Sequence, residues 1–87
     1  MNSRQFLDEP PAENRLTEYD RAHLSVYLRL LDAEADAADW EDAVHIIFGI
    51  DPRREHDRAL RVHTSHLARA RWMTANGYCD LLRSRLH

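Results

Sequence analysis

Residues 52–76, PRREHDRALRVHTSHLARARWMTAN, predict the longest helix of the chain and decide its fold class. Asp51 and Pro52 suit a helix start, because an Asp side chain accepts from free N–H groups and proline has no N–H to leave unpaired. Asn76 and Gly77 suit the left-handed turn that ends many helices. We therefore expect a helix over 52–76, with a break only where the Thr64-Ser65 hydroxyls cap a second segment.

Two opposed faces emerge when successive residues of this helix are placed about 100° apart. The sector expected to be buried contains Ala59, Leu60, His63, Leu67, Ala70 and Thr74. The sector expected to face solvent or a partner contains Arg54, Arg58, Arg61, Ser65 and Arg69. A basic stripe of this kind is typical of a DNA recognition helix and equally of an ordinary solvated face.

The length of 87 residues suits one small domain and not two. We expect a flexible tail over 1–15, which contains two adjacent prolines, and a single helical domain over 16–87. The alternative is that Phe6 and Leu7 dock on the body. No apolar run is long enough for a membrane span or a signal peptide, and the single cysteine, Cys79, fits a reducing compartment. These features predict a cytoplasmic protein that does not contact membranes.

Charge is distributed unevenly along the chain, although the net charge is only −3. Residues 1–49 hold eleven acidic residues and four arginines, whereas residues 50–87 hold four acidic residues and eight arginines. A dedicated DNA-binding domain is normally basic overall, with a pI above about 9, and this chain has a pI near 6.0. The acidic half therefore argues against DNA as the main partner.

Three further helices are expected from capping residues and apolar spacing. Thr17 is a predicted N-cap of the first, with Asp20 completing a capping box, and Asp39 is the predicted N-cap of a helix that ends at Gly49. A last short helix is expected after Gly77, and no segment alternates with the period of a strand. The fold class is therefore all-α, a small bundle of four to five helices that contains a helix-turn-helix-like core with an extended turn.

An acidic segment separates the first two helices. Glu34 and Asp36 stand near the end of a helix, where the helix dipole disfavours negative charge, so capping does not explain them. We interpret the segment either as a solvated face or as an acidic surface for a basic partner. The candidate partner-binding residues are Glu34, Asp36, Asp39, Glu41 and Asp42.

Residues that could carry chemistry are sparse. His63 and His66 are three positions apart, but no further ligand pattern accompanies them, so we expect no metal. The glycines do not form a phosphate-binding loop, and we expect no cofactor, no small-molecule ligand and no catalytic residues. Two tryptophans are candidate apolar anchors of an interface: Trp40 and Trp72, of which Trp72 could instead pack beneath the last helix.

The run RVHTSHLARARWMTANGYCDLL, residues 61–82, resembles a helix-turn-helix-variant domain family of proteobacterial integrative and conjugative elements, in particular its QseM-like antiactivators. The resemblance implies an antiactivator that occupies the N-terminal domain of a transcriptional activator. It thereby restrains excision and horizontal gene transfer of a mobile element under quorum-sensing control. The acidic surface would bind the activator, and DNA binding would be weak or absent. The alternative is a DNA-binding transcription factor that uses the stripe of Arg54, Arg58, Arg61 and Arg69.

Overall fold

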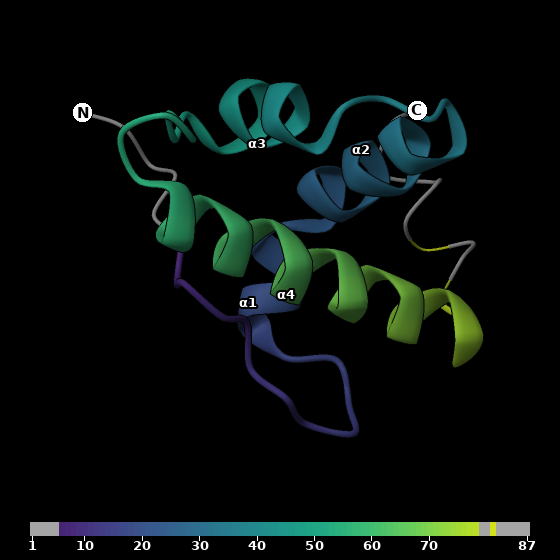
Figure 1. The fold of residues 1–87 in the computed structure, drawn as a ribbon. Helices are drawn as coiled ribbons and strands as arrows, with labels where there is room; N and C mark the ends of the chain where they lie inside the picture. The colour runs from purple at the N-terminus through teal and green to yellow at the C-terminus, as the bar shows by residue number, and fades with distance from the viewer. Residues whose placement is uncertain (1–5, 79–80, 82–87) are drawn as a thin grey trace.

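A computed structural model describes residues 6–78 and 81 of the chain. Within these residues four helices and no strands are present: α1 Glu18–Ala22, α2 Leu24–Ala35, α3 Trp40–Phe48 and α4 His56–Ala75. The long helix α4 runs along one side of the molecule and packs against both α2 and α3 (Figure 1). The predicted all-α class is confirmed. The predicted last helix lies mostly outside the described residues.

The first predicted helix is divided into α1 and α2 at His23. The capping box at Thr17 is confirmed, since the Thr17 side chain accepts from Asp20 N–H and the Asp20 side chain accepts from Thr17 N–H. The break has a local cause. The Nδ1 atom of His23 lies 2.8 Å from the Tyr19 carbonyl oxygen, which a continuous helix would pair with the His23 N–H. That N–H bonds to Asp20 O instead.

Capping residues set the ends of α2 and α3. Asp39 accepts from Glu41 N–H at the start of α3, and Gly49 ends the helix with a left-handed φ of 74°, both as predicted. The end of α2 was not foreseen: Ala37 adopts a φ of 57°, while Ala38 N–H bonds back to Ala33 O. A left-handed alanine is unusual, because its Cβ approaches the following carbonyl oxygen.

The helix α4 begins four residues later than predicted. The Asp51 side chain accepts from Arg53 N–H, and Asp51 O accepts from Arg54 and Glu55, so residues 51–55 form a turn. The helix runs without interruption through Thr64 and Ser65. Its predicted stop is confirmed, since Gly77 has a φ of 89° and Tyr78 N–H returns to Met73 O.

The buried face of α4 differs from the predicted one. Its buried residues are Ala59, Val62, His66, Arg69, Ala70 and Met73. Leu60, expected inside, is exposed, and Arg69, expected outside, is buried. On the wheel of about 100° per residue, the buried direction is rotated by roughly 80° from the predicted one. The prediction was wrong because it took arginine as a marker of the solvent side.

Two apolar clusters form the core on either side of the middle of α4. The larger joins α2, α3 and α4 and consists of Val26, Leu30, Ala43, Val44, Ile47, Phe48, Ile50, Ala59 and Val62. The smaller joins α2 to the C-terminal half of α4 and consists of Leu24, Tyr27, Ala70 and Met73. No helix among the described residues has the length and apolar character that crossing a lipid bilayer requires. The arrangement leaves one side of α4 open to solvent.

The segment before α1 lies against the body of the molecule. Phe6 packs on the larger cluster, with its ring 4.7 Å from that of Phe48, and Leu7 N–H donates to the Tyr19 hydroxyl. The Leu7 side chain itself is exposed. Residues 6 and 7 therefore contact α1 and α3, while the predicted flexibility of residues 1–15 stays a prediction.

Candidate nucleic-acid interface

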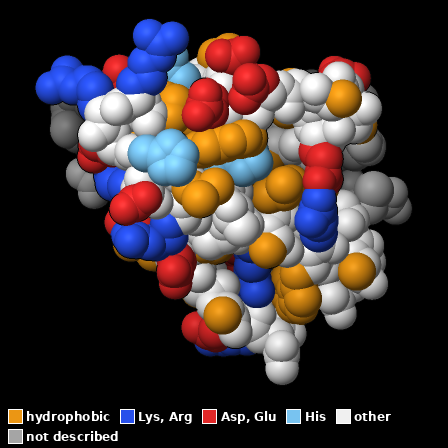
Figure 2. All heavy atoms as spheres, in the orientation of Figure 1, with side chains coloured by type: hydrophobic (Ala, Val, Ile, Leu, Met, Phe, Trp, Pro, Cys, Tyr) orange, Lys and Arg blue, Asp and Glu red, His pale blue; other side chains and the backbone are white. Residues whose placement is uncertain are grey.

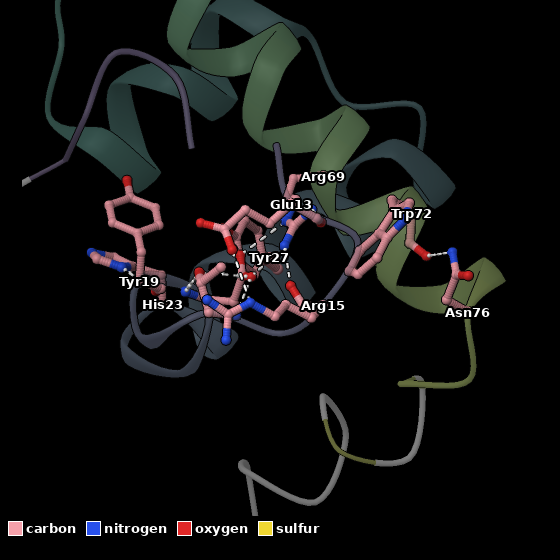
Figure 3. A network of polar contacts seen from close by, with 10 residues as sticks. Glu13, Arg15, Tyr19, His23, Tyr27, Arg69, Trp72 and Asn76 are labelled. Atoms are coloured by element: carbon pink, nitrogen blue, oxygen red, sulfur yellow. Dashed lines mark hydrogen bonds and ion pairs between the residues drawn. The ribbon is translucent and has the colours of Figure 1, made fainter. Parts of the chain in front are cut away.

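The Arg69 side chain is buried, and it points from α4 toward Tyr27 and the segment before α1 (Figure 3). Its Nε and Nη2 atoms donate to the Asp20 carboxylate at 3.1 and 2.6 Å. Nη1 donates to Glu13 O and Nη2 also donates to Arg15 O, at 2.6 and 2.8 Å. The guanidinium lies 4.0 Å from the centre of the Trp72 ring. All three guanidinium nitrogens of Arg69 therefore donate inside the fold, and Arg69 does not belong to a DNA-binding stripe.

Asp20 is the buried centre of this network. Its carboxylate also accepts from the Tyr27 hydroxyl at 2.8 Å and from Thr17 N–H at 2.9 Å. Burial opposes ionisation, but hydrogen bonds from Arg69, Thr17 and Tyr27 outweigh it and lower the pKa of Asp20 to about 2. Asp20 and Arg69 form a buried ion pair that holds α1 against α4.

Arg58 and Arg61 lie near the surface of α4 and share one carboxylate. Arg58 Nε donates to Asp8 Oδ1 at 3.0 Å, and Arg61 Nη1 donates to Asp8 Oδ2 at 3.3 Å. Arg58 also pairs with Glu55, the residue that precedes α4. The hydrogen bond from Arg58 lowers the pKa of Asp8, so the carboxylate is ionised near neutral pH. Asp8 of the N-terminal segment thus forms ion pairs with the two central arginines of the predicted stripe.

Arg53 and Arg54 occupy the turn that leads into α4. Both are exposed, and neither side chain makes a hydrogen bond or an ion pair with another described residue. Figure 2 shows basic side chains beside the N-terminal end of α4, whereas acidic side chains gather over α3. Since the first N–H groups of a helix carry partial positive charge, this end of α4 favours an anion. Arg53 was not singled out from the sequence, although its place in a turn before a long helix was a usable signal.

The five predicted acidic residues do not form one uniform surface. Glu34 forms an ion pair with Arg71 of α4, so its charge is compensated. Asp39 caps α3, and Glu41 and Asp42 lie in its first turn. Asp36 is exposed, and its side chain makes no hydrogen bond or ion pair with a described residue. Helix capping and an ion pair thus account for most of the acidic segment.

The two tryptophans are half-buried and pack mainly within the domain. The Trp40 ring contacts the rings of His56 and His63 and lies against the larger cluster. Trp72 lies beside Tyr78 and borders a groove between α4 and the prolines of the N-terminal segment. Neither ring is presented as a free anchor.

His63 and His66 of α4 differ in burial. His66 is fully buried and uses both ring nitrogens, with Nδ1 2.8 Å from Val62 O and Nε2 2.7 Å from the Tyr19 hydroxyl. His63 is half-buried against Trp40. No group of three potential metal ligands is present within the part of the chain that the structure describes.

Comparison with known proteins identifies a family. The chain matches, over residues 2–83, the family model described as "T6SS, Transcription factor, DNA binding domain", the RovC DNA-binding domain. A search of curated proteins found no match.

This match corrects the functional reading of the sequence. The resemblance to QseM-like antiactivators of conjugative elements was wrong as an identification, and with it the inhibited activator as partner, the link to gene transfer and the exclusion of DNA. The findings support the alternative, a DNA-binding transcription factor domain, which is not an enzyme. The charge argument failed because net charge averages over the whole surface, whereas DNA contacts only one part of it.

Proposed function

Because the chain belongs to the RovC family of transcription factor DNA-binding domains, we propose that it binds double-stranded DNA through the N-terminal end of α4. The observation that carries this choice of surface is the pair of exposed, unpaired arginines, Arg53 and Arg54, immediately before the helix. The proposal places the domain in the compartment that holds its DNA, in agreement with the cytoplasmic location predicted from the sequence.

The first turn of α4 supports this surface. Glu55 precedes the helix and makes no capping hydrogen bond with its side chain, so the first backbone N–H groups lack a side-chain acceptor. Backbone N–H groups at a helix start, together with arginines, are a common binding site for DNA phosphates. Arg53 and Arg54 would fix the position of the domain on the duplex in this way.

The order of elements also agrees with a helix-turn-helix mode of binding. Helix α3, the connection over residues 49–55 and α4 follow one another, and the N-terminal part of the second helix commonly reaches base edges in the major groove. His56 and Leu60 are exposed on the first turns of α4 and are the side chains we assign to this role.

Fluorescence anisotropy with labelled duplex DNA tests the proposal. Binding should weaken steeply between about 50 and 200 mM salt, because arginines that neutralise phosphates release counterions. The double variant Arg53→Ala, Arg54→Ala should reduce the slope of log affinity against log salt by about 2. It should also weaken binding roughly tenfold or more at low salt.

The matched control is Arg21→Ala, which removes an exposed arginine of α1 whose side chain makes no hydrogen bond or ion pair with a described residue. Its affinity should stay close to that of the wild type. Absence of any salt-dependent binding by the wild type would refute the proposed function. Equal losses in the control and in the double variant would refute the proposed surface.

A further inference from the structure

Asp8 holds the two arginines of α4 that follow the proposed binding end. Both lie in α4, and Arg61 lies about one helical turn beyond Arg58 along the same side. One oxygen of the Asp8 carboxylate accepts from Arg58 at 3.0 Å and the other accepts from Arg61 at 3.3 Å. The two guanidinium groups therefore converge on a single small anion.

A carboxylate bound in this way resembles a bound phosphate group. Guanidinium groups recognise carboxylate and phosphate oxygens with the same planar arrangement of N–H donors. In addition, the hydroxyl of Ser65 lies next to the site and donates to the backbone oxygen of Asp8 at 3.0 Å. Two arginines and a hydroxyl on one side of a helix form a typical set of donors to the DNA backbone.

The N-terminal segment is held so that Asp8 reaches this position. Phe6 is packed against the core, and Leu7 N–H donates to the Tyr19 hydroxyl at 3.2 Å. These contacts lie on the chain immediately before Asp8 and do not involve Arg58 or Arg61. The carboxylate is consequently delivered by a segment that the core fixes independently of the ion pairs.

We propose that Arg58 and Arg61 form a binding site for a DNA phosphate and that Asp8 occupies this site in the free domain, so that the N-terminal segment reduces DNA affinity. This inference rests on the proposed function and extends it to regulation of the same surface. A phosphate of the duplex displaces the carboxylate when DNA binds. Both arginines are about half exposed, so their pairs with Asp8 are weak enough for DNA to replace them.

The test is the affinity of the full chain for a labelled DNA duplex, measured for the wild type and for Asp8→Asn. The variant should bind about threefold to tenfold more tightly, because the competing charge is gone. Its slope of log affinity against log salt should be steeper by about 1, corresponding to one additional neutralised phosphate. In the Arg58→Ala, Arg61→Ala background, Asp8→Asn should have no effect.

Glu9→Gln is the matched control, since it removes the same charge from the next residue, whose exposed side chain makes no ion pair with a described residue. An equal gain in both variants would show a general charge effect and overturn the inference. Unchanged or weaker binding by Asp8→Asn, with a thermal unfolding temperature like that of the wild type, would overturn it as well.

Failure of this inference is separable from failure of the proposed function. If the wild type binds DNA and Asp8→Asn does not change its affinity, only the competition by Asp8 is refuted. If neither protein binds DNA at low salt, both are refuted. Asp8→Ala provides a second variant that removes the carboxylate, and it should reproduce the gain seen with Asp8→Asn.

Discussion

Arg69 and Asp20 lie 49 positions apart in the sequence and form a buried ion pair, with Arg69 Nη2 2.6 Å from Asp20 Oδ2. The pair joins the short helix α1 to the C-terminal half of α4. Because Arg69 also donates to two backbone carbonyl oxygens of the segment before α1, one side chain fixes three parts of the fold. The arginine that looked like a contact for DNA is a structural residue.

Replacing Arg69 by Met should lower the free energy of unfolding by about 3–5 kcal/mol, because Asp20 is left as a buried charge without its cation. Urea unfolding followed by circular dichroism measures this change. Arg71→Ala is the control: its partner Glu34 is partly exposed, and exposed pairs contribute about 0–1 kcal/mol. Similar losses in the two variants would contradict the structural role of Arg69.

Acid should destabilise the domain through Asp20. The pKa of Asp20 is about 2 in the folded protein and 3.8 in the unfolded chain. Its contribution to the free energy of unfolding is therefore present above pH 3.8 and is lost as the pH falls towards 2. The difference corresponds to about 2 kcal/mol. Unfolding midpoints measured across this range should fall less steeply for Asp20→Asn than for the wild type. The exposed Asp36→Asn should retain the wild-type profile, and identical profiles for all three proteins would exclude the effect.

A second loss of stability is expected at milder pH through His66. Burial lowers its pKa below the ordinary 6.5, so the unfolded chain takes up the proton first and stability falls as the pH drops below 6.5. His66→Phe should reduce this dependence but not abolish it, since burial also lowers the pKa of His63. The exposed His45→Gln serves as the control. The prediction fails if His66→Phe has the same slope of stability against pH as the wild type.

Ala37→Gly should stabilise the domain by about 1 kcal/mol. Ala37 ends α2 with a φ of 57°, a conformation that places Cβ near the next carbonyl oxygen, and glycine adopts it without this repulsion. Thermal or urea unfolding measures the gain. Ala68→Gly, at an exposed position within α4, should instead destabilise by about 1 kcal/mol. A loss of stability in Ala37→Gly would contradict the strain inferred here.

Local chemistry made several helix ends predictable. Thr17 and Asp39 precede helices because their side chains accept from the free N–H groups at a helix start. Gly49 and Gly77 follow helices because glycine, without a Cβ, readily adopts the left-handed conformation found there. The start of α4 was not predictable by the same reasoning. Asp51 uses its carboxylate to form a turn, and its preference for helix starts and for turns has the same physical origin.

The interface could be predicted only in part. A basic stripe on the long helix was recognised, but whether each arginine is paired or free depends on acidic residues far away in the sequence. Arg69 is paired with Asp20, Arg58 and Arg61 are paired with Asp8, and Arg54 alone of the predicted stripe remains without a partner among the described residues. The spacing of residues along one helix contains no information about such distant pairs.

The sequence by itself determined the all-α class and the caps at Thr17, Asp39, Gly49 and Gly77, because these depend on residues within a few positions of one another. The direction in which α4 buries its side chains was decided only by the tertiary structure. There the carboxylate of Asp20 made it favourable to bury Arg69 while Leu60 stayed in solvent. Burial of a charge is favourable only beside its counter-charge, and the fold alone places Asp20 and Arg69 together.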